Sequence, residues 1–173
     1  MKGLILFFSF IALGSSTFAQ EFKGLNDLPM KTNEDFKMAE PTVKECAGYI
    51  LSHPSSNDDR SAANAGIFML KWMSGSPDYS FNLDMDATKY AKKDNGLLMV
   101  CMASMAKTAL DNPAKAKDTK ALKLSSFKLF AEYCANAKYK VKQSSEIKKL
   151  IKANESGTLE KCLDFSALDE QKK

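Results

Sequence analysis

Along most of the chain, hydrophobic residues recur at steps of three and four, the spacing that places them on one face of an α-helix. Between Val43 and Leu51, for example, these steps bring Cys46, Ala47 and Ile50 to the same side. No window of several residues shows the alternation that a half-buried strand requires. The sequence therefore predicts an all-α protein: a single-domain compact helical array of about five to seven helices in antiparallel hairpins, with solenoid-like stacking as one alternative.

Capping and breaking residues set the expected helix boundaries. Thr32-x-x-Asp35 fits a capping box, and the helix that it starts is expected to end before Pro41, because the residue before a proline is disfavoured in the α region. A second helix is expected between Thr42 and His53. The remaining helices are expected over residues 56–74, 86–92, 95–110, 117–137 and 144–156.

The segment 95–110 differs from the others because it is apolar on almost every side between Leu97 and Ala106. A helix of this kind is normally surrounded by other helices, so we expect it at the centre of the fold. Its methionines are either core residues or an adaptable binding surface, and their equally apolar neighbours favour the core.

The first 19 residues have the layout of a secretory signal peptide. Met1-Lys2 supplies a positive charge, and residues 4–13 form a run that is apolar except for Ser9. The small residues Thr17 and Ala19 occupy the two positions that a signal peptidase recognises. A membrane anchor is the alternative, but a spanning helix needs about 20 apolar residues, more than this run provides. We therefore expect cleavage after Ala19, a periplasmic or secreted protein, and no transmembrane segment in the mature chain.

The rest of the chain is expected to comprise a flexible N-terminal arm over residues 20–31, a helical domain over 32–163 and a disordered tail over 164–173. The net charge is +4, and the basic excess lies in the second half. All basic residues except Arg60 are lysines, whereas specific nucleic-acid sites favour arginine, so we predict no nucleic-acid partner. The lysine-rich faces are either a solvated surface or a surface for anionic lipid or polysaccharide.

Four cysteines allow three full pairings in an oxidising compartment. Cys46 and Cys134 lie on amphipathic helices and make the more favourable disulfide, whereas Cys101 lies in the most apolar run and is expected to be a buried thiol. No C-x2-C spacing occurs and His53 is the only histidine, so we predict no bound metal and no cofactor.

The stretch from Trp72 to Phe81 gathers the only tryptophan and two further aromatic residues around a Gly-Pro turn. Rigid aromatic side chains dominate recognition hot spots, so Trp72, Tyr79 and Phe81 are candidate anchors of a groove that binds a ligand or peptide. The alternative is a helix that ends at Gly75, after which the aromatic side chains fold back on the core.

Three acidic residues are candidates for cation binding or for acid–base chemistry: Asp78, Asp84 and Asp86. Residues 82–86 begin like an EF-hand calcium loop, but the positions of that loop that need Gly and Glu are occupied by Ala87 and Lys93, so we predict no calcium site. The chain also lacks nucleophile-elbow, metalloprotease, Walker and dinucleotide-binding motifs, so no catalytic residue is assigned.

The leader, the run W-M-x-G-x-P-D-Y-x-F at Trp72 to Phe81 and the run A-E-Y-C at Ala131 to Cys134 together resemble uncharacterised small exported all-helical proteins of Bacteroidota. The resemblance implies a Gram-negative periplasmic or exported setting and brings no activity or ligand with it. The leading expectation is a non-enzymatic module that binds an envelope protein or peptide. The alternatives are an enzyme acting on envelope material and a basic-surface, envelope-associated or stress-protective protein.

Overall fold

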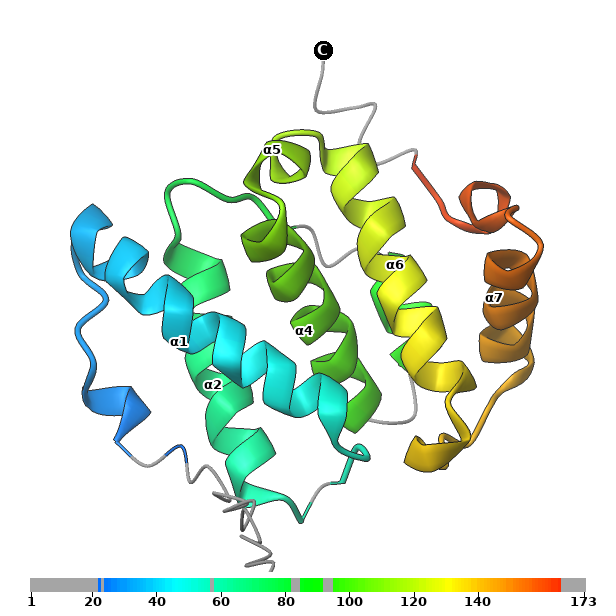
Figure 1. Cartoon of the computed structure of the whole chain (residues 1–173), viewed down its shortest axis with the longest axis horizontal. Helices are drawn as coiled ribbons and strands as arrows, with labels where there is room; N and C mark the ends of the chain where they lie inside the picture. Colours follow the sequence, from blue (N-terminus) through cyan, green and yellow to red (C-terminus); the bar gives the residue numbers. More distant parts are fainter. Residues whose placement is uncertain (1–21, 23, 57, 82–84, 92–94, 166–173) are drawn as a thin grey trace, which may run out of the picture.

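The central element of the protein is a helix that is surrounded by other helices (Figure 1). The structure is a computed structural model that describes residues 22, 24–56, 58–81, 85–91 and 95–165. Within these residues the chain forms helices and no strand, in one compact domain, which confirms the predicted all-α fold. The described helices are α1 (Asn33–Ser52), α2 (Arg60–Gly75), α3 (Met85–Ala91), α4 (Asn95–Asp111), α5 (Pro113–Ala116), α6 (Thr119–Ala135) and α7 (Ser145–Glu155), with 3-10 turns η1 (Leu25–Asp27), η2 (Ala137–Tyr139) and η3 (Leu159–Cys162).

The helices are arranged on two sides of α4. On one side α1 and α2 pack against each other and against α4, and on the other side α6 packs against α4 (Figure 1). α7 is outermost and contacts α6, while α3 lies behind α6 in this view and contacts α4 and α7. The ends of α1, α2 and α4 therefore come together at the lower edge of the molecule in Figure 1.

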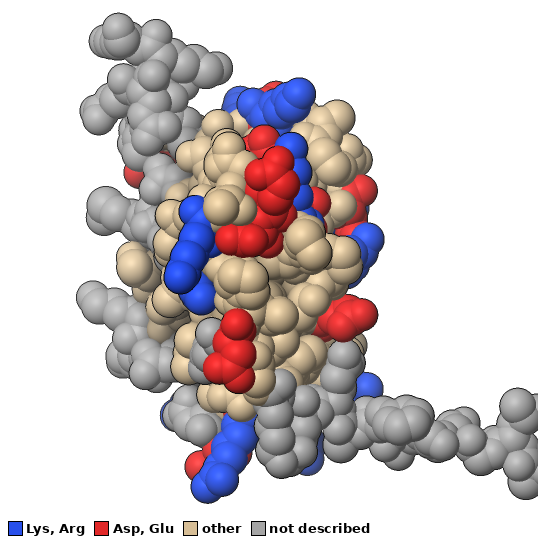
Figure 2. Space-filling model, turned by 90° about the vertical axis from the view of Figure 1, so that its left-hand side faces the viewer, with Lys and Arg blue, Asp and Glu red and all other residues tan. Residues whose placement is uncertain are grey.

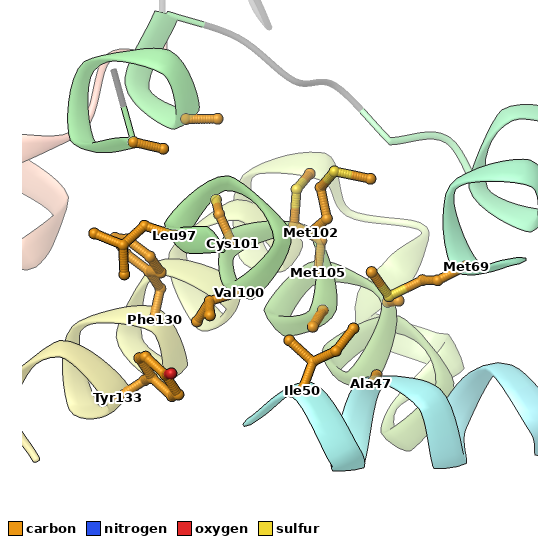
Figure 3. Close-up of a cluster of buried hydrophobic side chains, with 14 of the residues drawn as sticks. Ala47, Ile50, Met69, Leu97, Val100, Cys101, Met102, Met105, Phe130 and Tyr133 are labelled. Carbon is orange, nitrogen blue, oxygen red and sulfur yellow. The ribbon is translucent and has the colours of Figure 1, made fainter. Parts of the chain in front are cut away.

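Side chains of α4 form the middle of the hydrophobic core (Figure 3). Val100, Cys101 and Met105 are almost inaccessible to solvent, and they share a cluster with Ile50 of α1 and Phe130 of α6, so the predicted central position of this helix is confirmed. Burying one such side chain contributes about 1.5–3 kcal/mol, so α1 and α6 are held on α4 chiefly by the hydrophobic effect. Neither α4 nor any other helix in the described part is long and apolar enough to cross a membrane.

α1 continues through Pro41, so the predicted break before this residue is wrong. The capping box at its start is confirmed, because Thr32 Oγ1 accepts from the Asp35 N–H at 3.2 Å and Asp35 Oδ2 accepts from the Thr32 N–H at 2.9 Å. A proline inside a helix removes one backbone hydrogen bond and destabilises the helix by about 3 kcal/mol. The helix persists because the turns on both sides of Pro41 bury one continuous face, with Ala39 before it and Val43 after it in the core.

Two other helix starts lie a few residues beyond the predicted positions. α2 begins after Asp59, whose side chain accepts a hydrogen bond from the Ala62 N–H at 2.9 Å. α6 begins after Asp118, which accepts in the same way from the Ala121 N–H at 3.0 Å. Both aspartates satisfy a backbone donor that has no partner inside the first turn of its helix, which fixes the start at these residues.

A close approach between α2 and α4 depends on a glycine. A Cβ atom at Gly66 would lie only 2.2 Å from the Sδ atom of Met99, so any larger residue would have to displace this side chain. Glycine inside a helix is less favourable than alanine by about 1 kcal/mol, and here that disadvantage is offset by contact between the two helices.

The described part of the segment predicted as an N-terminal arm lies against the core. Phe22 and Met30 are buried, and the ring of Phe22 meets Tyr49 edge-on at 5.3 Å between ring centroids. These two residues are apolar members of a mostly polar segment. The free energy gained by removing their side chains from water outweighs the conformational entropy that the segment loses on docking. The predicted signal peptide lies outside the described residues.

The first residues of the predicted tail are also docked, through a buried ion pair. Asp86 of α3 and Lys123 of α6 are 3% and 6% exposed, and their charged atoms are 2.7 Å apart. Asp86 Oδ2 accepts from the Asp164 N–H at 2.7 Å, and Lys123 Nζ donates to the Asp164 carbonyl. The chain is thus held in place as far as Phe165, whose ring lies 5.2 Å from Lys123 Nζ, and the remainder of the predicted tail lies outside the described residues.

The predicted disulfide between Cys46 and Cys134 is not formed in the structure, where all four cysteines are thiols. Cys46 belongs to α1 and Cys134 to α6, and these helices pack on different sides of α4. Cys101 is buried as predicted. Burial raises the pKa of the Cys46 thiol to about 12, so this side chain is an unreactive member of the core.

Candidate binding site

A cleft of about 150 Å³ lies where the end of α1, the following loop and the first turns of α2 and α4 meet. Ile50 and Val100 form its buried floor, and half-buried Met99 lies beside them. His53 and Ser56 are exposed at its rim. We call this feature, lined also by Pro54, Ser55, Ala62, Ala63 and Gly96, the His53 cleft.

The His53 cleft exists because small residues occupy the positions where the three helices converge. Ala62 and Ala63 in the first turns of α2 and Gly96 at the start of α4 contribute little side-chain volume. Longer side chains at these positions would fill the cleft and cover Ile50. The result is an apolar floor that opens to solvent between polar groups, which is the usual composition of a ligand site.

The imidazole of His53 is held in one orientation. Its Nδ1 atom is 2.8 Å from the carbonyl oxygen of Tyr49, and its ring stacks on the Tyr49 ring with 4.1 Å between centroids. The Tyr49 hydroxyl donates to Asp59 Oδ2 at 3.2 Å, and Asp59 in turn caps α2. Burial, followed by the nearby charge of Asp59, raises the pKa of the Tyr49 hydroxyl, which therefore remains a hydrogen-bond donor at neutral pH.

The loop between α1 and α2 is fixed from the opposite side by α6. The hydroxyl of Tyr133 donates to the carbonyl oxygen of His53 at 2.8 Å. Burial raises the pKa of Tyr133 to about 12, although hydrogen bonds with Ser55 lower it in part. The rim of the His53 cleft is therefore attached to α1 through Tyr49 and to α6 through Tyr133, so the site is preorganised.

Sequence reasoning did not select this site. Tyr49 and Tyr133 occupy the same place in two similar segments, V-K-E-C-A-G-Y ending at Tyr49 and F-K-L-F-A-E-Y ending at Tyr133. In the structure both tyrosines converge on His53. That internal similarity was the one available signal, because the alanines and the glycine that leave the cleft open carry no recognisable motif.

The predicted aromatic site is brought together, but its central residue is inaccessible. Trp72 is 0% exposed, and its Nε1–H donates to the Phe36 carbonyl at 3.1 Å. Tyr79 and Phe81 cover it, with ring centroids 5.3 and 5.5 Å from that of Trp72. The arrangement corresponds to the alternative in which the aromatic side chains fold back on the core, and only half-buried Tyr79 and Phe81 retain contact with solvent.

The candidate aspartates are held by different partners. Asp86 is engaged in the buried ion pair with Lys123, whereas Asp78 lies on the surface with its Oδ2 3.7 Å from Lys37 Nζ. Burial, followed by the negative charge of Asp78, raises the pKa of Glu40. Asp84 lies outside the described residues. Among the described residues, no three His, Cys, Asp or Glu side chains form a group able to hold a metal ion.

A second apolar region lies at the first turns of α1 and the segment before it. Figure 2 shows the left-hand side of the view in Figure 1, where charged side chains are scattered over a mostly uncharged surface. Met38 is 79% exposed, and it lines a cleft of about 150 Å³ with Leu28 and Pro29. Asp35 is the charged group at this cleft, and its carboxylate is already engaged in the capping box of α1. The His53 cleft is the stronger candidate, because buried apolar residues form its floor and His53, Ser55 and Ser56 add polar groups to its lining.

No protein-family model, curated protein or solved structure matches the chain. The resemblance to exported helical proteins of Bacteroidota thus stays a prediction. The geometry of the His53 cleft is suited to binding an apolar group and one hydrogen-bonding group at the same time.

Proposed function

We propose that the protein is a non-enzymatic binding module whose His53 cleft accepts an apolar side chain of a protein or peptide partner. The observation that supports this most directly is the juxtaposition of a buried apolar floor, Ile50 and Val100, with a rim that Tyr49 and Tyr133 hold in place. A rigid rim lowers the entropy that binding would otherwise cost. Covering the floor with an apolar group removes hydrophobic surface from water, which supplies the driving force.

The first experiment follows the Met99 methyl group by NMR while the protein is titrated with N-acetyl amino acid amides. The leucine and phenylalanine derivatives are expected to shift this signal in a saturable way, and the glutamine derivative of similar size is expected not to. Binding through other apolar surfaces would instead shift the Met38 methyl group, which lines the second cleft.

A variant that fills the cleft provides the matched test. Ala63→Phe places a ring at the rim of the His53 cleft, whereas Ala114→Phe makes the same change at an exposed site on α5, near the opposite end of α4. The first variant is expected to lose the Met99 response and the second to keep it, with both retaining the helical circular dichroism of the unmodified protein. An equal response in both variants would refute the proposed function.

We further propose that the protein acts outside the cytoplasm after removal of the first 19 residues, on the strength of the signal-like leader. Expression of the full chain in a Gram-negative host, followed by N-terminal sequencing, is expected to give a mature chain that begins at Gln20. Recovery of the protein in the cytoplasm with Met1 or Lys2 at its N-terminus would contradict this.

A further inference from the structure

We propose that one edge of the molecule, formed by η2, the loop after it and the outer face of α7, docks on an anionic phospholipid surface. We call it the lysine edge and define it by six exposed residues: Lys138, Lys140, Lys142, Lys148, Lys149 and Lys152. The lysine edge shares no residue with the His53 cleft, so this docking goes beyond the proposed function and is independent of it.

The net charge of the chain is concentrated in the lysine edge. Residues 136–155 contain six lysines and two glutamates, and this excess equals the net charge of +4 of the whole chain. Within the described part of the chain, Lys149 is the only one of the six that forms an ion pair, with Glu146 at 3.4 Å. On the opposite side of the molecule, charged groups of both signs are scattered over the surface (Figure 2). The molecule therefore has one predominantly positive edge.

The loop before α7 presents its lysines to solvent because the residues between them pack inward. Tyr139 and Val141 are half-buried and lie against the hydrophobic core. The Tyr139 ring also stacks on the ring of Tyr133, with 4.3 Å between centroids. The three lysines of the loop alternate with these anchored residues, which leaves their side chains on the outside: Lys138, Lys140 and Lys142.

α7 extends the lysine edge with its outer face. Its buried residues are Ile147, Leu150 and Ala153. With 3.6 residues per turn, its three lysines lie on the opposite side of the helix. The main contacts of α7 are with α6, α3 and η3, so this side faces away from the rest of the molecule. The loop and α7 run in different directions at the right-hand side of Figure 1, so the lysines are spread over an area.

One of the lysines has a backbone conformation that is unfavourable for this residue type. Lys140 has φ 51° and ψ 35°, and it is the only non-glycine residue with a positive φ among the described residues. Glycine adopts this left-handed conformation without the steric conflict that a Cβ atom introduces. An exposed turn thus carries a less stable residue than it could, which favours a role for the Lys140 charge outside the fold.

This layout fits an extended anionic surface better than a small ligand or a chain. Both clefts described above are lined by other parts of the protein, and side chains on the outer face of a helix diverge, whereas a small anion needs groups that converge. A linear polyanion would contact charges along one line. Lysine is a point charge without the fork by which arginine holds single phosphates. An anionic bilayer attracts each lysine near its surface without requiring such a fixed geometry.

The test measures binding of the untagged protein, as recovered from the expression experiment above, to vesicles of equal parts of phosphatidylglycerol and phosphatidylcholine. Vesicles of pure phosphatidylcholine control for apolar contacts of the leader, and binding to them should be much weaker. In 1 M salt, where the screening length is about 3 Å, binding to the anionic vesicles should be lost. Equal binding to both kinds of vesicle, or binding that resists salt, would overturn the proposal.

Two triple variants with the same change in net charge locate the contact. The first combines Lys138→Gln, Lys140→Gln and Lys142→Gln, and the second combines three exposed positions outside the lysine edge: Lys31→Gln, Lys71→Gln and Lys115→Gln. One lysine near an anionic bilayer contributes a factor of about five to binding. The first variant should therefore bind on the order of 100-fold more weakly, and the second less than about fivefold more weakly. Equal losses would overturn the assignment to the lysine edge.

Lys140→Gly separates a role in binding from a role in folding. This variant should bind the anionic vesicles about fivefold more weakly. Its free energy of unfolding should be unchanged or higher, because glycine relieves the left-handed backbone. Unchanged binding, or weaker binding together with lower stability, would overturn the role assigned to the Lys140 charge.

A soluble polyanion distinguishes a lipid surface from a polysaccharide. Polygalacturonate, added at a concentration of carboxylates equal to that of phosphatidylglycerol, should displace little of the protein from the vesicles. Binding of polygalacturonate that depends on the three lysines of the loop, with no binding to anionic vesicles, would overturn the choice of a lipid partner. Either result leaves the proposed function standing, because the Met99 response of the His53 cleft is measured without lipid.

Discussion

The two ends of α2 use their side chains in opposite ways. At its C-terminal end, Trp72 is completely buried under Tyr79 and Phe81, so the most conspicuous aromatic residues of the sequence stabilise the fold. At its N-terminal end, Ala62 and Ala63 leave the His53 cleft open. Large side chains at a helix junction fill the space that a ligand would need, whereas small ones preserve it, so candidate sites are better sought where apolar residues become small.

The largest expected effect is at the aromatic end. Trp72→Ala removes a fully buried ring and its hydrogen bond to the Phe36 carbonyl, and we expect the free energy of unfolding to fall by about 3–5 kcal/mol. Urea denaturation followed by circular dichroism measures this change. Ile67→Ala, at a half-exposed position of the same helix, is the control and should cost less than about 1 kcal/mol. Similar losses for both variants would mean that Trp72 is not the anchor of this end.

The next largest expected loss of stability is at the contact between Gly66 and Met99, which lies between the two ends of α2. Gly66→Ala forces Met99 to move, and we expect a destabilisation of about 1–3 kcal/mol together with weaker binding at the His53 cleft. Met99→Ala alone should also destabilise the protein, but the double variant should be less destabilised than the sum of the two, because the shortened side chain no longer meets the new methyl group. Additive losses would contradict the steric explanation.

At the cleft itself the expected effect is smaller. Tyr133→Phe removes the hydroxyl that holds the His53 carbonyl and should lower the free energy of unfolding by about 1 kcal/mol. Hydrogen exchange at the backbone of residues 53–56 should accelerate. Tyr139→Phe is the matched control, since its ring stacks on Tyr133 at 4.3 Å and its hydroxyl makes no hydrogen bond among the described residues. Faster exchange in the control variant would assign the effect to ring packing instead.

The smallest effect is expected at the far end of α4, where Asp111 links α1 and α4. Hydrogen bonds from Lys107 and Lys44 lower the pKa of Asp111, so its stabilisation is complete above the ordinary carboxyl pKa and is lost as the pH falls through the lowered value. Asp111→Asn should destabilise the protein at pH 7 by less than about 1 kcal/mol, because the pair is partly exposed.

Thermal unfolding at several pH values measures this contribution. The difference between Asp111→Asn and the unmodified protein should vanish below the lowered pKa and should shrink in 1 M salt at pH 7, where exposed charges are screened. Glu155→Gln, an exposed change on α7, is the control and should show no such dependence. A difference that persists in strong acid would point to a role other than the ion pairs.

The sequence predicts the core of this protein well, for a physical reason. The three- and four-residue spacing along residues 95–110 depends only on local helix geometry. Because that segment is apolar on all sides, other helices must cover it, whichever helices these are. Thr32 was recognisable as a cap because a capping hydrogen bond is formed within one turn. Pro41 was misjudged because its local preference is opposed by burial against helices that are distant in the sequence.

The candidate site was less predictable, since it depends on the absence of large side chains where three helices meet. Trp72 was a candidate binding residue because it is the only tryptophan, but its burial depends on Tyr79 and Phe81, whose rings cover it. The orientation of His53 depends on an adjacent turn and on Tyr133, which is 80 residues away in sequence. Neither relationship produces a pattern in a single chain.

The docking of residue 164 has a consequence for how this chain is expected to diverge during evolution. Asp86 and Lys123 hold that residue through its main-chain N–H and carbonyl groups, which every amino acid except proline provides. Proline is therefore expected to be excluded from position 164, because it has no backbone N–H to donate to Asp86. Positions 86 and 123 should change together, because replacing one partner leaves the other charge buried without its ion-pair partner. An apolar pair of similar volume restores a stable arrangement.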